Sequence, residues 1–267
     1  MALDWAKLPQ NAKPLWWARR LDTVHRFARF WVAYDSRTQV PPVGVFGPSY
    51  HRGPVHIYTD KEITALLQAT CHLGPSRGWQ PNAYRTLLGL LACTGLRISE
   101  ALALEDPDVD CESGVLTVRR GKGGHSRCLP LHASAVVALK NYRHLRRRII
   151  AQPKSSAYFQ SSRGTPLVYS RVAAVFRQLC NGLGWTHRPR PRLHDLRHTF
   201  AVRCLIRWHE RNEDVGQKML ALSTYLGHRQ VSDTYWYLTA VPQLLKLSSK
   251  RFEASANGSH AYESNCA

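Results

Sequence analysis

Histidine and arginine recur in two segments at spacings that suit phosphate binding. The motif H-D-L-R-H places His194 and Arg197 three residues apart, so on a helix they would share one face and could hold one phosphate together. In T-G-L-R-I-S-E, Arg97 follows a glycine break and opens a helix that is otherwise mostly apolar. Each pattern also has an ordinary explanation, which is a solvated basic helix face for the first and an exposed Arg97–Glu100 salt bridge for the second.

Two other segments could supply a proton donor and a nucleophile. The stretch G-K-G-G carries Lys122 between strand-forming residues, so the lysine would lie at the tip of a flexible hairpin and could reach a substrate. Further along, His228 follows a helix-ending glycine, and Tyr237 comes nine residues later. A soluble turn would explain the first segment without any function, and packing or capping would explain the second.

The balance of charge predicts a polyanionic partner. Among 267 residues, 37 Lys and Arg stand against 18 Asp and Glu, which gives a net charge of +19 at pH 7, and 28 of the basic residues are Arg. Guanidinium groups bind phosphate as bidentate forks, so the partner that we expect is nucleic acid.

No membrane span, secretion signal or metal site is expected. The longest apolar run, Leu87 to Cys93, is far below the roughly 18 residues that a span needs, and the first residues lack the order of a signal peptide. The seven cysteines are scattered and form no C-x-x-C pair, which fits free thiols in a reducing compartment. We therefore expect a cytoplasmic, metal-free protein that makes no membrane contact.

The elements that would position these residues are mostly helical. Thr59 and Glu62 have the spacing of a capping box and predict the start of a domain after a linker rich in proline and glycine. Strand-forming residues at 114–119 and 126–129 predict a hairpin around the glycine-rich tip. The expected fold is mainly α (α+β), with one small antiparallel sheet. Helices are predicted within 14–34 and at about 82–93, 98–104, 132–150, 170–182, 195–208, 214–226 and 232–248.

Taken in order, the motifs resemble those of the tyrosine recombinases, which are phage-integrase-type site-specific recombinases. The resemblance runs from about Tyr58 to Phe252 and rests on T-G-L-R-I-S-E, G-K-G-G-H-S-R, H-D-L-R-H-T-F, Y-L-G-H and a terminal tyrosine. It implies a helical catalytic domain with a small antiparallel sheet. It places the family's catalytic set on Arg97, Lys122, His194, Arg197, His228 and Tyr237, and it makes Glu100 and His198 supporting residues.

The resemblance also implies how these residues act. The two arginines clamp the nonbridging oxygens of a DNA phosphodiester, and His228 hydrogen-bonds the phosphate. His194 takes the proton of Tyr237, which attacks the phosphorus and forms a 3′-phosphotyrosine, while Lys122 protonates the leaving 5′-oxygen. Because the covalent bond conserves the energy of the ester, strands are rejoined without ATP, metal or cofactor. Such enzymes serve the integration, transposition or recombination of mobile elements.

Domain limits and an assembly follow from the same resemblance. The family has a core-binding domain of several helices before the catalytic domain, and the first 45 residues have room for one or two, so we expect a shortened form. The implied partner is double-stranded DNA, and a homo-oligomer, a tetramer, is implied on it. The expected parts are a partial core-binding (SAM-like) region at 1–45, a linker at 46–56, the catalytic domain at 57–252 and a flexible tail at 253–267.

Alternatives stay open at three points. Tyr235 also lies near the nucleophile position, although the nine-residue interval from His228 selects Tyr237. A type IB topoisomerase would use similar chemistry to relax supercoils without exchanging strands. A non-catalytic DNA-binding protein would need only the basic charge, and the complete set of six catalytic positions argues against it.

Overall fold

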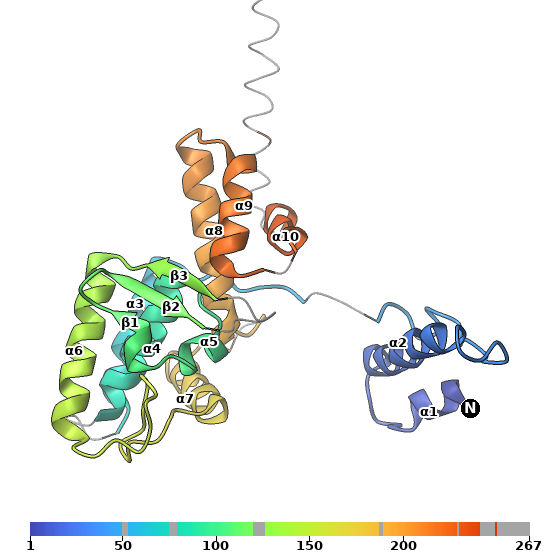
Figure 1. The fold of residues 1–267 in the computed structure, drawn as a ribbon, viewed down its shortest axis with the longest axis horizontal. Coiled ribbons are helices and arrows are strands. Elements are labelled where there is room, and N and C mark those ends of the chain that lie inside the picture. Colours follow the sequence, from blue (N-terminus) through green and yellow to red (C-terminus); the bar gives the residue numbers. More distant parts are fainter. Residues whose placement is uncertain are drawn as a thin grey trace, which may run out of the picture. The chain divides into compact units, whose positions relative to one another are not determined.

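The chain divides after Pro54 into two units, residues 1–54 and 55–267, which are described separately. The computed structural model describes residues 1–49, 53–74, 79–119, 126–186, 189–228, 230–240 and 249 (Figure 1). Lys122, the part of the expected last helix from 241 to 248 and the expected tail at 253–267 lie outside the described residues. Within the described ranges, no helix is both long and apolar enough to cross a membrane.

The first unit contains two helices, α1 (Ala2–Lys7) and α2 (Pro14–Trp31). Pro14 starts α2 at a position where its missing N–H costs nothing. The sequence predicted α2 but not α1, which has six residues and no side-chain cap. Small apolar residues of both helices are buried, whereas α2 exposes a row of aromatic side chains: Trp16, Phe27, Phe30 and Trp31.

The second unit is built around α4 (Trp79–Thr94), a mostly apolar helix that supplies much of the core. It packs against α3, α6 and α8. The capping box predicted from Thr59 and Glu62 is present at the start of α3, with the Thr59 amide 2.7 Å from the Glu62 carboxylate. The remaining helices of the described ranges are α3 (Asp60–Ala69), η1 (Thr70–His72), α5 (Ile98–Leu102), η2 (Asp106–Asp108), α6 (Ala133–Ile149), α7 (Tyr169–Gly182), α8 (Leu193–Glu210), α9 (Val215–Leu226) and α10 (Ser232–Ala240).

A three-stranded antiparallel sheet lies beside this core (Figure 1). Its order is β1 (Val109–Asp110), β2 (Val115–Val118) and β3 (Arg127–Pro130). The hairpin of β2 and β3 confirms the expected antiparallel sheet, and Val118 pairs with Arg127 at its turn end. The two-residue strand β1 was not predicted, because such a short segment carries no alternation that a sequence could reveal. The expected mainly helical fold with a small antiparallel sheet is confirmed.

Helix α8 connects two apolar clusters of the second unit. Leu193 and Leu196 at its start belong to the main core, whereas Ala201, Val202 and Leu205 pack with α9 and α10 in a smaller cluster. Figure 1 shows α8, α9 and α10 together as a layer that extends from the body of the unit. His194, Arg197 and His198, which the sequence predicts to do chemistry, lie in the first half of α8.

Candidate active site

Arg97 and Glu100 lie at the start of α5 and form a buried pair. The backbone N–H and Nη1 of Arg97 donate to the two carboxylate oxygens of Glu100, at 3.0 and 2.8 Å. Only 7% of Glu100 is exposed, so the surface salt bridge considered from the sequence is not what forms here. The glycine before this turn is needed: at Gly95, with φ of +64°, a Cβ atom would lie 2.6 Å from the ring of Phe200.

The C-terminal end of α9 gathers three arginines that are far apart in the sequence. A helix end leaves backbone carbonyls without intrahelical partners and carries a partial negative charge. Consecutive carbonyls at this end each accept a hydrogen bond from a different guanidinium. The pairs are Tyr225 with Arg127 Nε at 2.8 Å, Leu226 with Arg197 Nη2 at 2.7 Å, and Gly227 with Arg97 Nη2 at 3.0 Å.

Arg197 carries a positive charge in the interior of the unit. Its side chain is only 2% exposed, and its Nη1 donates to the carbonyl of Gly95 at 2.9 Å. Burial, and after it the nearby charge of Arg97, lower the pKa of Arg197 to about 10, so it remains cationic at pH 7. Within the described part of the chain its hydrogen-bond acceptors are neutral carbonyls, so its charge remains able to attract an anion.

Arg127 is a residue of this site that the sequence reasoning missed. Its Nη2 and Nη1 donate to the Glu100 carboxylate at 2.8 and 3.2 Å, so Glu100 lies between two guanidiniums. Burial raises the pKa of Glu100, but hydrogen bonds from Arg127 and Arg97 outweigh this, and the net pKa is below its usual range. The available signal was the last letter of G-K-G-G-H-S-R, in which only the lysine was assigned a role.

Tyr237 lies in α10 against the histidines of α8. Its hydroxyl is 2.9 Å from Nδ1 of His198, and the rings of His198 and His194 are in edge contact, with centroids 4.6 Å apart. Only 2% of Tyr237 is exposed, compared with 49% of Tyr235. The supporting residue predicted from the motif, His198, is therefore the one that contacts the expected nucleophile.

His228 completes this group from the loop that joins α9 to α10. It follows Gly227, whose φ of +65° ends α9 in the left-handed conformation. Nδ1 of His228 is 2.6 Å from the hydroxyl of Thr234, and its ring lies nearly parallel to that of Tyr237, with centroids 6.4 Å apart. The structure thus brings together seven of the eight predicted residues, together with Arg127, in one region of the second unit. The eighth, Lys122, lies outside the described residues.

All three histidines of the site are held neutral at pH 7. Burial, and then the charges of Arg197 and Arg97, lower the pKa of His194 and of His228 to about 4. Burial, followed by the neighbouring His194, lowers the pKa of His198 to about 3. A neutral imidazole keeps one nitrogen lone pair, so each of the three can accept a hydrogen bond.

These pKa values predict that the protein loses stability on mild acidification. In the unfolded chain these histidines become protonated below pH 6.5, the ordinary pKa of histidine. In the folded site the same side chains stay neutral until about pH 4. Each histidine should therefore lower the free energy of unfolding by up to about 1.4 kcal/mol per pH unit in this window. Thermal unfolding measured between pH 7.5 and 5 should show a smaller dependence of the melting temperature on pH for His194→Gln than for the wild type. An equal dependence on pH in the two proteins would contradict the pKa shifts.

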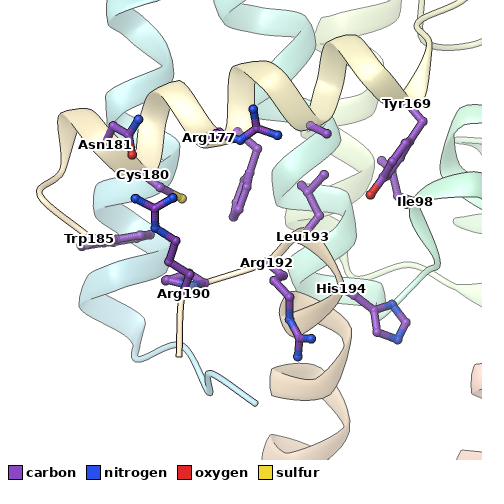
Figure 2. Close-up of a pocket in the computed structure, with 13 residues that line it drawn as sticks. Ile98, Tyr169, Arg177, Cys180, Asn181, Trp185, Arg190, Arg192, Leu193 and His194 are labelled. Carbon is purple, nitrogen blue, oxygen red and sulfur yellow. The ribbon is translucent and has the colours of Figure 1, made fainter. Parts of the chain in front are cut away.

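A basic hollow of about 350 Å³ lies beside His194, between α7 and the segment that leads into α8. Figure 2 shows Arg190 and Arg192 on this segment, His194 in the first turn of α8 and Arg177 on α7. Arg192 pairs with the buried Asp195 at 2.9 Å. Among the described residues, Arg177 and Arg190 form no ion pair, so their charges face the hollow and can attract an anion.

Comparisons with known proteins give a consistent result. The sequence matches the Phage integrase family over residues 57–243. It is 41% identical over 261 residues to a protein named integrase/recombinase y4rB of Sinorhizobium fredii (strain NBRC 101917 / NGR234), covering 95% of this chain and 83% of that protein. It is 29% identical over 228 residues to tyrosine recombinase XerD of Staphylococcus saprophyticus, covering 85% and 72%. In fold it is similar to the Tn1549 transposon integrase, with a TM-score of 0.65 and 17% identity, covering 94% and 84%.

Proposed function

The chain belongs to the phage integrase family of tyrosine site-specific recombinases, and from this premise we propose that it cuts and rejoins DNA through a covalent 3′-phosphotyrosine at Tyr237. The observation that carries this proposal is the end of α9, where Arg97 and Arg197 converge beside the histidines that surround Tyr237. Three guanidiniums against one carboxylate leave an excess of positive charge for a phosphate. We assign this activity to residues 57–252.

The two arginines stabilise the charge that develops on the phosphoryl group. The Nη atoms of each arginine donate hydrogen bonds to backbone carbonyls or to Glu100. The orientation of each guanidinium is therefore fixed before DNA binds. A preorganised clamp of this kind costs no rearrangement when the reaction occurs. Arg97 and Arg197 therefore bind the two nonbridging oxygens, and His228 adds a hydrogen bond to the same phosphate.

Proton transfer accompanies the exchange of bonds at phosphorus. The Tyr237 oxygen forms a bond to phosphorus as the bond to the 5′-oxygen breaks, His194 accepts the tyrosine proton, and Lys122 supplies a proton to the 5′-oxygen. His198 holds the tyrosine hydroxyl before DNA arrives, since the two groups are already hydrogen-bonded. The reverse steps, with the 5′-hydroxyl of another strand, rejoin the DNA and restore both protonation states.

DNA is the partner that the charge distribution supports. The net charge is +19, and the basic hollow of Figure 2 adjoins His194, where the strand would continue past the reacting phosphate. The similar Tn1549 transposon integrase is described in complex with transposon right end DNA, which supports a mobile element as the setting. Exchange between two duplexes breaks four strands, and with one nucleophile per chain this requires four chains, which we assign to a homotetramer on DNA.

A nicked suicide substrate tests the proposal. The top strand of the native flanking DNA is nicked next to the cleavage site, so that a short 5′-hydroxyl fragment diffuses away and the covalent species accumulates. We expect a protein–DNA species that resists denaturant. A non-catalytic DNA-binding protein would give a gel shift but no such species. A type IB topoisomerase would instead relax a supercoiled plasmid that lacks the site, which we do not expect here.

Lys122 provides a separate test of the leaving-group step. Lys122→Ala should cleave an ordinary substrate on the order of 10²-fold more slowly, which is within the range for loss of a general acid. A substrate with a 5′-bridging phosphorothiolate should restore the rate, because sulfur leaves without a proton. Single-turnover cleavage of the two substrates measures this difference. An equal defect on both would remove Lys122 from the role.

A further inference from the structure

Arg127 directs its side-chain hydrogen bonds to other residues of the second unit. Three of the five N–H donors of a guanidinium are accounted for: Nε on the Tyr225 carbonyl and the two Nη atoms on the Glu100 carboxylate. Its side chain is 12% exposed. Both Nη atoms of Arg127 therefore donate to Glu100, whereas Arg97 gives only Nη1 to that carboxylate. This arrangement suits a residue that acts on the site through its neighbours.

The contacts of Arg127 join three separate parts of the site. It is the first residue of β3 and comes five residues after Lys122 in the sequence. Through Glu100 it reaches Arg97, because the same carboxylate accepts hydrogen bonds from both guanidiniums at 2.8 Å. Through the Tyr225 carbonyl it reaches the end of α9, where Arg197 and Arg97 are also anchored.

The shape of the α9 end fits this side chain closely. A Cβ atom at Gly227 would lie 2.8 Å from Nη1 of Arg127, a distance that neighbouring side chains do not tolerate. Gly227 also has a φ of +65°, which favours glycine. The absence of a side chain at Gly227 thus allows its carbonyl to bind Arg97 while Arg127 passes beside it.

We propose that Arg127 is a positioning residue of the cleavage reaction, which holds the Glu100 carboxylate, and through it Arg97, against the end of α9. The inference rests on the proposed function, because it concerns the geometry of the same phosphate clamp. Without Arg127, Glu100 would keep Arg97 as its partner but lose two of its four hydrogen bonds. The pair would no longer be fixed to β3, and the Arg97 fork would lose its alignment with Arg197.

The expected effect is on the rate of cleavage, not on DNA affinity. Arg127→Gln should slow single-turnover cleavage at saturating DNA by about 10-fold to 100-fold, since misplacement of a catalytic group by about 1 Å has effects of this size. Its dissociation constant for DNA should change by less than about threefold, because affinity is distributed over many phosphate contacts. A double-mutant cycle with Glu100→Gln tests the route: in the Glu100→Gln background, the further loss caused by Arg127→Gln should shrink to less than about threefold.

A matched control separates positioning from stability. Arg146 on α6 is a buried arginine that pairs with Asp106 and donates to the carbonyls of Ala157 and Tyr158. None of these contacts involves a residue of the site. Arg146→Gln should lower the melting temperature at least as much as Arg127→Gln and leave cleavage within about twofold of wild type. Comparable cleavage losses in both variants at comparable melting temperatures would overturn the proposal.

A readout that does not depend on cleavage keeps the proposal testable if Arg127→Gln is unstable or the wild type is inactive. Removing Arg127 takes away a positive charge and two hydrogen bonds that stabilise the buried Glu100 carboxylate. The pKa of Glu100 in the folded protein should therefore rise, and Glu100 should gain a proton more readily as the pH falls. The destabilisation by Arg127→Gln should therefore be smaller at pH 5 than at pH 7.5, and in the Glu100→Gln background it should not change with pH. If the destabilisation by Arg127→Gln did not change with pH in the protein that retains Glu100, the link between the two residues would be overturned. Absence of a covalent species with wild type would overturn only the proposed function.

Discussion

Replacing Tyr237 by Phe is expected to abolish the covalent protein–DNA species, whereas Tyr235→Phe should form it at the wild-type rate. Phenylalanine lacks the oxygen that would bond to phosphorus, and the Tyr237 hydroxyl is the one that lies against His198, at 2.9 Å. Tyr235 lies two residues away on α10 and is 49% exposed, so its loss leaves the histidines and arginines in place.

Labelled nicked substrate on a denaturing gel measures this difference directly. A gel shift under native conditions serves as the control, and both variants should bind DNA within about threefold of wild type, since one hydroxyl is a small part of an interface dominated by phosphate contacts. If the Tyr237→Phe protein still became attached to DNA and the Tyr235→Phe protein did not, the nucleophile would be Tyr235.

Arg197→Gln should reduce single-turnover cleavage by at least about 10²-fold, because it removes a preorganised charge from the developing transition state. The glutamine amide can still donate to one of the two carbonyls that Arg197 binds, which limits the structural damage. DNA affinity should fall by much less than the rate. Measurement at saturating DNA separates the two quantities.

Arg203→Gln provides the matched control for this prediction. Arg203 lies on the same helix, donates to the Tyr58 carbonyl at 3.1 Å and pairs with Asp60, and it takes no part in the site. Its substitution should leave cleavage within about twofold of wild type. Wild-type cleavage by Arg197→Gln at equal DNA occupancy would show that the clamp does not act on the reacting phosphate.

The sequence predicted those parts of the structure that residue types encode locally. The capping box of Thr59 and Glu62 starts α3 as expected, and the glycine-flanked strands form the hairpin of β2 and β3. Apolar periodicity identified the helices that carry the motifs, with ends that differ by a few residues. The family motifs named seven residues that the structure places in one region, although their roles stay predictions.

The missed features are those in which the backbone is the partner. Nothing in the residue types of Tyr225, Leu226 or Gly227 indicates that their carbonyls anchor three arginines, because every residue has a carbonyl and only the fold leaves these at a helix end. Arg127 was missed because its partners, the Tyr225 carbonyl and the Glu100 carboxylate, lie far from it in the sequence. The burial of Glu100 was also missed, since a pair three residues apart on a helix is usually exposed.

The central claim is that Tyr237 becomes covalently bound to a DNA 3′-phosphate. The most direct measurement is mass spectrometry of the wild-type covalent species after digestion with nuclease and protease. We predict one modified peptide, from α10, that carries a nucleotide 3′-phosphate on Tyr237 and leaves a free 5′-hydroxyl on the released strand. A modified residue other than Tyr237, or a 5′-phosphate attached to the protein, would contradict it.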